Sequence, residues 1–344
     1  MNKHGYSFSF GPWNIHEGAD PFGPPVRPSQ SFEAKLPTYG ELGFDAVQFH
    51  DDDVVPDLEN LNPAQIRDQA RNMRKKLQDH GLTAEFVAPR LWEHPLGIDG
   101  AFTANSADSR EWAIQRTKRC IDILNEMDSH LMVIWLAREG SYLREAKNAV
   151  EATHRLVEAI NILLEYDPSL KIAIEPKPNE PMDLAYIPTM GHGLALGMQS
   201  SDPERVGVLM ESAHAILAGL DPADEISFAL AFGKLWSVHL NDQNGLKFDQ
   251  DRSFGSVDLR RAFNQVRILD ENRYWEQGMV GLDVKAIRTQ PADKATKHLR
   301  NSLDAFLQLV EISRSLDRSR VDELIAARDY EELDWLILSK LMGK

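Results

Sequence analysis

Eight short apolar runs rich in β-forming residues recur along this chain, separated by longer stretches, several of which have helical spacing. The runs predicted as strands occupy residues 6–13, 44–50, 83–89, 130–137, 170–177, 205–211, 235–241 and 279–285. Helices are predicted over 63–81, where Gly81 would cap the C-terminus, and over 108–127, 143–165, 257–269 and 294–315. Strand–helix repeats of this kind imply a parallel sheet, and eight of them imply a closed (β/α)8 (TIM) barrel.

Polar and aromatic side chains gather at one place in this pattern, at or near the C-terminal ends of the predicted strands. They are Trp13, His50, Trp135, Glu175, Glu211, His239 and Asp283. In a (β/α)8 barrel those strand ends converge on one mouth, which is where such enzymes carry out their chemistry. Residues spread over most of the sequence are therefore expected to become neighbours.

The barrel pattern predicts one catalytic domain over residues 1–315. Residues 316–344 fall outside the repeat and are predicted to be helical, with Val321, Leu324 and Ile325 on one face. We expect this C-terminal helical extension to be a packing arm, with a neighbouring subunit as one candidate surface.

Composition narrows the class of protein and its partners. With 42% apolar residues in 344, the chain can bury a large core. Its formal net charge of −15 argues against nucleic acid and against an anionic membrane surface as partners. Cys120 is the single cysteine, and no apolar run approaches the length of a membrane span, so a cytoplasmic protein is expected.

Four stretches supply most of the chemistry-bearing residues: IEPKPNEP (174–181), GVLMESAH (207–214), VHLNDQNGLKFDQD (238–251) and GLDVKA (281–286). Together they hold carboxylates, two imidazoles and the lysines Lys177 and Lys285, each beside an apolar run. Carboxylate oxygens and imidazole nitrogens suit Mg, Mn and Co, and no thiolate competes. The combination indicates a divalent-metal site.

Each part of this cluster also has a plain structural interpretation. Asp249 and Asp251 could form an acidic surface turn. Glu211 and His214, three residues apart, could be a solvated pair on a helix face. His239 could be a core histidine that packs beside the metals without binding them.

These motifs resemble those of xylose isomerase, a metal-dependent aldose–ketose isomerase with a (β/α)8 barrel. The likeness runs from about residue 6 to about residue 315. It is carried, in family order, by FGPW (10–13), DPFG (20–23), FHDDD (49–53), GAFTAN (100–105), REG (138–140), IEPKPNEP, DQNGLKFDQD (242–251) and DVK (283–285). The resemblance implies two divalent cations (Mg, Mn or Co), a small sugar as substrate and a homotetramer or homodimer.

Carried over residue by residue, the resemblance also implies individual roles. The first cation would be held by Glu175, Glu211, Asp283 and the residue at position 239, and the second by Glu211, His214, Asp249 and Asp251. His50, oriented by Asp53, would open the sugar ring, Lys177 would sit near the substrate C1 oxygen, and Asp251 would serve proton transfer between the two oxygens. Substrate contacts are implied for Trp13, Trp92, Trp135 and Lys285, while Phe22 matches the residue that reaches into a neighbouring subunit's site.

The chain departs from the family pattern at three positions. His239 stands where the family usually has aspartate, as in the similar rhamnose isomerases, and a neutral imidazole there should favour Mn or Co over Mg. Asp242 could compensate as an outer or alternative ligand. Trp92 replaces the usual phenylalanine and Met182 the usual arginine, which leaves the identity of the sugar open.

Five functions compete on this evidence. The leading hypothesis is an aldose–ketose isomerase that uses two metals and a 1,2-hydride shift. A sugar isomerase of rhamnose-like specificity and a ketose epimerase with one metal and paired glutamates are the alternatives, and the pair Asp249 and Asp251 together with Lys177 favours the isomerase. An endonuclease IV-type enzyme is disfavoured by the acidity, and a non-enzymatic sugar-binding paralogue by the intact site residues.

Overall fold

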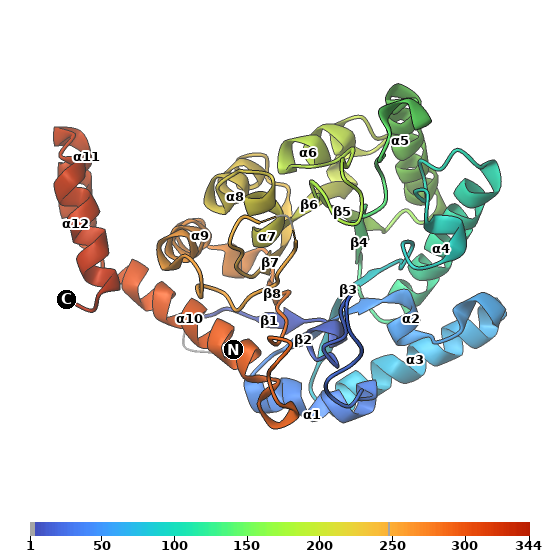
Figure 1. Ribbon diagram of the computed structural model, residues 1–344, viewed down its shortest axis with the longest axis horizontal. Coiled ribbons are helices and arrows are strands. Elements are labelled where there is room, and N and C mark those ends of the chain that lie inside the picture. Colours follow the sequence, from blue (N-terminus) through green and yellow to red (C-terminus); the bar gives the residue numbers. More distant parts are fainter. Residues whose placement is uncertain (1–3, 247) are drawn as a thin grey trace.

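The computed structural model describes residues 4–246 and 248–344, so residues 1–3 and Lys247 of the 242–251 motif lie outside it. The expected (β/α)8 barrel is confirmed: among the described residues eight parallel strands pair in chain order, and β8 closes on β1 (Figure 1). The strands are β1 (Phe8–Phe10), β2 (Ala46–His50), β3 (Thr83–Ala88), β4 (Leu131–Trp135), β5 (Lys171–Glu175), β6 (Val206–Glu211), β7 (Leu235–Leu240) and β8 (Val280–Leu282).

Helices surround this barrel on the outside (Figure 1). They are α1 (Phe32–Leu42), α2 (Asp51–Val54), α3 (Pro63–Asp79), α4 (Ala107–Glu126), α5 (Ala149–Tyr166), α6 (Met190–Met198), α7 (Ser212–Leu217), α8 (Pro222–Ala231), α9 (Leu259–Glu271) and α10 (Lys297–Arg314). Two more helices, α11 (Arg318–Ala327) and α12 (Tyr330–Leu341), follow them in the chain. The barrel elements therefore run from β1 to the end of α10, which lies one residue before the expected boundary at 315.

Side-chain caps decide where several helices begin. The Asn62 side chain accepts hydrogen bonds from the N–H groups of Ala64 and Gln65, and the Gln65 side chain accepts one from the Asn62 N–H, so α3 starts with a complete capping box. Ser106 and Asp258 cap α4 and α9. At the other end of α3, Gly81 has φ +70°, the left-handed conformation predicted for a residue that stops a helix.

The core has two parts with different chemistry. Between strands and helices it is apolar and aromatic, with Phe8 packed edge-on against Phe306 at 5.5 Å. Inside the barrel a polar group lies below the mouth: the Glu85 carboxylate accepts hydrogen bonds from Gln48 (3.0 Å) and Ser237 (2.8 Å). This half-buried carboxylate holds Gln48 in one orientation, which matters for the site above it.

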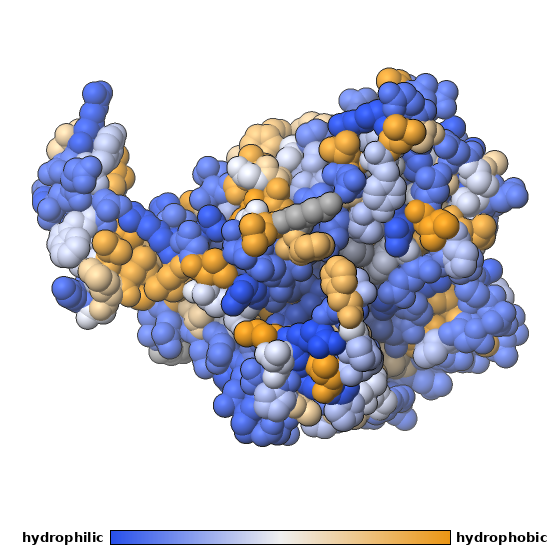
Figure 2. Space-filling model, viewed as in Figure 1, coloured by the Kyte–Doolittle hydropathy of each residue, from blue (hydrophilic) through white to orange (hydrophobic). Residues whose placement is uncertain are grey.

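Helices α11 and α12 form an arm that stands away from the barrel (Figure 1). Leu324 of α11 is buried, but Ile325 and Trp335 are each about half exposed. Figure 2 shows apolar side chains in the angle between the arm and the barrel. An ion pair between Arg260 of α9 and Asp334 of α12 ties the arm to the barrel.

Within the described residues, no helix combines the length and the apolar character needed to cross a bilayer. Cys120 is a free, fully buried thiol in α4.

Candidate metal and sugar site

Three consecutive strands deliver acidic and imidazole side chains to the barrel mouth. Glu175 and Glu211 are the last residues of β5 and β6, and His239 is the penultimate residue of β7, paired in register with Glu211. Asp283 follows β8 directly. The expectation that distant strand ends converge is therefore met.

One cavity of about 520 Å³ opens at this mouth. Its lining includes Trp13, His50, Trp92, Trp135, Glu175, Lys177, Glu211, His214, His239, Asp249, Asp251, Asp283 and Lys285. These are all of the predicted site residues except Asp53 and Phe22. The structure thus brings together side chains that lie up to 272 residues apart, from Trp13 to Lys285.

Glu211 is the centre of the possible metal ligands. Its carboxylate belongs to three groups, and within each group one ligand atom per residue lies within 4.8 Å of the others. The groups are Glu175–Glu211–His214, Glu211–His239–Asp283 and Glu211–Asp249–Asp251. Because Glu211 is only 1% exposed, water does not compensate these carboxylates.

The charges in this cluster are unbalanced as they stand. Burial and neighbouring carboxylates raise the pKa values of Glu211 and Asp251. Asp249 behaves oppositely: burial would raise its pKa, but the Lys177 ammonium, whose Nζ lies 2.8 Å from Asp249 Oδ2, holds it well below its usual range. Lys285 forms an ion pair with Asp251, but this opposes the rise in the pKa of Asp251 only in part. Two lysines do not offset five carboxylates, so the cluster favours bound cations.

Unpartnered buried atoms test whether divalent cations fit. Among the described residues, His214 Nδ1, His239 Nδ1 and Asp249 Oδ1 are buried and have no hydrogen-bond partner. Polar atoms buried in this way are normally satisfied. All three belong to the possible ligand residues, so the donor set fits divalent cations.

The orientation of His239 favours direct ligation over simple packing. Gln48 donates its amide N–H to Glu85, which turns its carbonyl Oε1 toward His239 Nε2 at 3.1 Å. Nε2 must then carry the ring proton in the neutral imidazole, and the Nδ1 lone pair faces the carboxylates of Glu175 and Glu211 at 3.6 Å each. A partner that fixes the far ring nitrogen is typical of metal-binding histidines.

Without a cation this histidine should hold a second proton. Burial alone would lower the pKa of His239, but the negative charges of the nearby Glu175 and Glu211 carboxylates raise it well above the usual value. A bound cation would take the place of that proton.

Asp242, the suggested compensating ligand, is turned away from the cluster. Its carboxylate accepts hydrogen bonds from the backbone N–H groups of Gln243, Val257 and Asp258. It therefore holds the loop that carries Asp249 and Asp251, and it leaves no free oxygen pointed at the metal ligands.

Across the cavity, His50 ends β2 and has two competing partners. Asp53 Oδ2 lies 3.1 Å from His50 Nδ1, and Arg90 Nη2 lies 2.8 Å from the same atom. A carboxylate only accepts and a guanidinium only donates, so Nδ1 can serve one of them at a time. Arg90, which follows β3, was not among the residues predicted from sequence.

Below His50, the acidic run 51–53 is anchored in the barrel wall. Asp51 is completely buried and accepts two hydrogen bonds from Arg116 of α4, at 2.9 and 2.8 Å. It also accepts one from the Arg90 N–H at 3.1 Å. The buried Asp51–Arg116 pair thus holds both the segment that carries Asp53 and the segment that carries Arg90.

Aromatic rings form the apolar wall of the cavity. Ring centroids are 4.4 Å apart for Trp13 and His50, 5.1 Å for His50 and Trp92, and 4.5 Å for Trp92 and Trp135. Lys177 Nζ lies 5.0 Å above the Trp135 ring and links this wall to the acidic half. Aromatic faces beside polar groups suit the C–H surface of a sugar.

The position of the Trp13 ring depends on Gly11, two residues earlier in the chain. Its Nε1 donates to Asp283 Oδ1 at 2.9 Å, and its ring folds back over Gly11. A Cβ on Gly11 would lie 2.1 Å from the ring atom Cη2 of Trp13. Only glycine leaves room for this arrangement.

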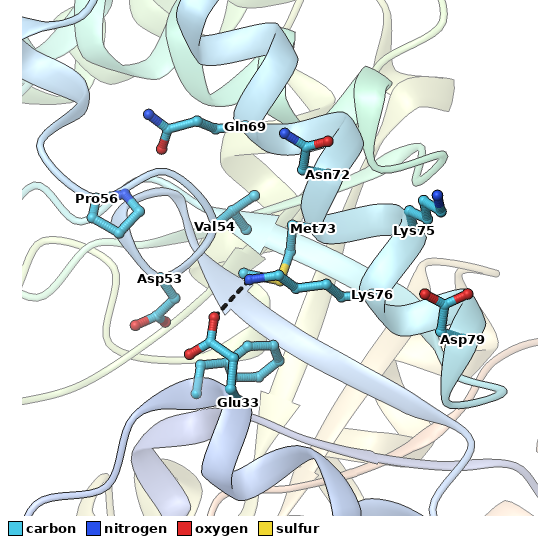
Figure 3. Close-up of a pocket in the computed structure, with 11 residues that line it drawn as sticks. Glu33, Asp53, Val54, Pro56, Gln69, Asn72, Met73, Lys75, Lys76 and Asp79 are labelled. Carbon is cyan, nitrogen blue, oxygen red and sulfur yellow. Dashed lines mark hydrogen bonds and ion pairs between the residues drawn. The ribbon is translucent and has the colours of Figure 1, made fainter.

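Asp53 and Phe22 lie outside the cavity lining. Asp53 reaches His50 from behind, where it also borders an outer groove between α1 and α3 (Figure 3). In that groove Glu33 and Lys76 pair at 2.6 Å. Phe22 is 89% exposed and does not approach the site of its own chain; its predicted contact with a neighbouring subunit stays a prediction.

Comparison with known proteins decides the family. Residues 39–306 match the family described as xylose isomerase-like TIM barrel, which is most of the chain. The chain belongs to this family. The broader resemblance expected from sequence is confirmed, while the particular member it is most like is not decided by this match.

Solved structures support the same fold. A D-tagatose 3-epimerase-like protein is 17% identical, with a TM-score of 0.65 over 89% of this chain and 98% of its own. A 3-keto-D-glucoside 4-epimerase from E. coli is 15% identical, with a TM-score of 0.62 over 88% and 99%. The IolI protein with a zinc atom is 13% identical, with a TM-score of 0.63 over 90% and 100%. At these identities the likeness concerns the fold.

Proposed function

We propose that this protein is a metal-dependent aldose–ketose isomerase that holds two divalent cations at the barrel mouth. One observation carries the proposal: the buried Glu211 carboxylate belongs at once to a group with His239 and Asp283 and to a group with Asp249 and Asp251. A shared carboxylate between two ligand sets suits a pair of cations. Bound there, the cations would polarise the two oxygens of the reacting carbon pair of an open-chain sugar.

The remaining residues supply the other parts of the reaction. His50, with Asp53 or Arg90 at Nδ1, can move a proton at the ring oxygen or the anomeric hydroxyl and so open a cyclic sugar. Lys177, held by Asp249, adds positive charge where an alkoxide develops. Asp251, paired with Lys285, can pass a proton between the substrate's O1 and O2. The tryptophan wall would orient the carbon chain and exclude water.

A ketose epimerase is the second candidate. It is supported by the similar structures described as epimerases and by the adjacent Glu175 and Glu211, which resemble the paired glutamates of a one-metal site. Such an enzyme has no need of the second carboxylate pair or of Lys177. We therefore favour the isomerase, with a rhamnose-like sugar specificity as a further option.

A substrate panel separates these functions. The protein is incubated with aldoses and ketoses, including rhamnose, in the presence of Mg, Mn or Co, and the products are identified by NMR. We expect an aldose and its ketose to interconvert, with Mn or Co more effective than Mg. A product epimerised at C3 would favour the epimerase, and no turnover with any cation would favour a sugar-binding paralogue.

Replacing His50 with asparagine should slow the reaction of cyclic sugars by about a hundredfold, because general acid–base catalysis contributes roughly that much. Cation affinity should stay unchanged, since His50 is in none of the ligand groups. Steady-state kinetics and calorimetric cation titration measure the two effects. Equal rates for the variant and the parent protein would remove His50 from ring opening.

Replacing His239 with aspartate should shift cation preference toward Mg by about tenfold relative to Mn, because an oxygen ligand replaces a nitrogen ligand. The ratio of the Mg and Mn dissociation constants, measured by calorimetry for both proteins, tests this. If the ratio does not move, His239 packs beside the cations without binding them.

For assembly we propose a homodimer or homotetramer in which the arm contacts another subunit. The half-exposed Ile325 and Trp335 of the arm and the exposed Phe22 support this. Analytical ultracentrifugation of the full chain and of a chain ending at residue 315 should show a smaller assembly for the shortened protein.

A further inference from the structure

A second cavity, of about 690 Å³, lies where the loop after β1 meets the loop after β8 and the start of α10. Its charged lining consists of Arg252, Lys285, Arg288, Lys294, Lys297 and one carboxylate, Asp20. The chain as a whole has 53 acidic and 38 basic residues. The lining of this cavity is therefore positive although the protein as a whole has a net charge of −15. The overall composition does not account for this difference.

Two of these cations are not engaged by carboxylates. Arg288 pairs with Asp20 at 2.7 Å, Lys294 with Asp293 at 2.6 Å, and Lys285 with Asp251. Within the part of the chain that the structure describes, Arg252 and Lys297 form no ion pair. The cavity therefore retains uncompensated positive charge.

The walls of this cavity are fixed by a buried arginine. Arg27 is 6% exposed and donates from Nη1 to the carbonyl oxygens of Ile287 (3.2 Å), Arg288 (3.0 Å) and Gln290 (2.8 Å). Arg288 Nη2 in turn donates to the Pro24 carbonyl at 2.8 Å. The two loops are thus tied together before any ligand arrives, as in a preformed binding site.

A neutral donor also borders this space. His16 Nδ1 accepts a hydrogen bond from the Gly18 N–H at 2.9 Å, so its proton sits on Nε2, a buried atom without a partner. Burial, and then the charges of Lys285 and Arg27, lower the pKa of His16 to about 4, so the ring stays neutral near pH 7. It can donate one hydrogen bond.

The start of α10 adds to the positive character. Lys297 and His298 open this 18-residue helix, and Thr296 at its N-cap makes no side-chain cap. The free N–H groups and the dipole of a helix N-terminus favour an anion.

We propose that this cavity binds the phosphoryl group of a small phosphorylated molecule. Several cations, a neutral N–H donor and a helix N-terminus match a doubly charged tetrahedral oxyanion that accepts many hydrogen bonds. The volume leaves room for an organic moiety as well as the phosphoryl group. This site goes beyond the proposed isomerase and does not depend on it, because Arg252 and Lys297 do not line the metal cavity.

The test compares two double variants of the metal-loaded protein. R252Q/K297Q removes the two unpaired cations of the cavity, and R74Q/K75Q removes one arginine and one lysine from α3, so both have the same net charge. Binding of inorganic phosphate and of glucose 6-phosphate is measured by calorimetry, with glucose as the uncharged comparison.

We expect both phosphate compounds to bind the parent protein, and the dissociation constant to rise about tenfold or more in R252Q/K297Q, since charge-assisted hydrogen bonds are lost. In R74Q/K75Q it should change less than about twofold, as exposed, screened charges predict. Tighter binding of glucose 6-phosphate than of phosphate would show that the phosphoryl group arrives on an organic carrier, and the reverse order would identify free phosphate. Absence of binding, or equal weakening in both variants, would overturn the proposal, as would unchanged affinity in R252Q/K297Q, which would place the phosphate on the metals.

Discussion

Replacing Glu211 with glutamine should abolish turnover, by about a thousandfold or more, because bound cations contribute several kcal/mol to stabilising the transition state. The substitution keeps the size of the side chain but removes the charge that all three ligand groups share. Equilibrium dialysis should show the number of bound cations falling from two to less than one at concentrations that fill the parent protein.

Glu93→Gln is the matched control. Glu93 lines the same cavity, carries the same charge and belongs to none of the ligand groups. It should keep both cations and most of the activity. A Glu211→Gln protein that still holds two cations would refute the shared-carboxylate arrangement.

The second large effect concerns stability. Arg116→Met should lower the free energy of unfolding by about 3–5 kcal/mol, because it leaves the Asp51 carboxylate buried without its partner. Asp51 is wholly inaccessible and Arg116 is 6% exposed, so solvent cannot replace the lost ion pair. Urea denaturation followed by circular dichroism measures the change.

Arg119→Met tests the same chemistry at the surface. Arg119 lies one turn along α4, pairs with Glu59 at 3.0 Å and is 37% exposed. Exposed pairs contribute about 0–1 kcal/mol, so this variant should be nearly as stable as the parent protein. Asp51→Asn combined with Arg116→Met should recover part of the loss. Equal destabilisation by the two arginine variants would mean that burial of Asp51 is not the cause.

The sequence was sufficient to predict the barrel and most of the side chains that line its mouth. Alternating apolar runs reveal parallel strands, and a polar residue that closes such a run marks the strand's C-terminal end. Glu175 and Glu211 are of this kind, and both lie where that reasoning places them. The prediction depends only on local pattern and on the geometry that every closed parallel barrel shares.

The sequence did not reveal the side chains that orient the two histidines of the mouth. Gln48, Glu85 and Arg90 orient His239 and His50, yet each sits in or beside a strand with no local pattern to mark it. Their importance arises from contacts between strands that are far apart in the chain. For His239, the argument for direct ligation depends on the contact of its far ring nitrogen with Gln48, which no sequence pattern shows.

Element boundaries differed for local reasons. Most predicted strands extended one to three residues too far. For β5 the reason is Pro176, which directly follows Glu175 and ends the pairing before Lys177. Helix α1, which has Pro37 in its interior, and the glycine-rich α6 do not show the polar–apolar spacing that marks α3, and neither was predicted.

The contact between Gly11 and Trp13 has a consequence for how this pocket can change over evolution. At Gly11, directly after β1, no side-chain atom can be added, and the Trp13 ring that packs over it is hydrogen-bonded to Asp283. Substitutions at Gly11 and Trp13 should therefore be rare when the pocket changes to accept a new sugar. Trp92, in the loop after β3, and Trp135, the last residue of β4, pack against no such glycine, and diversification among related proteins should concentrate there.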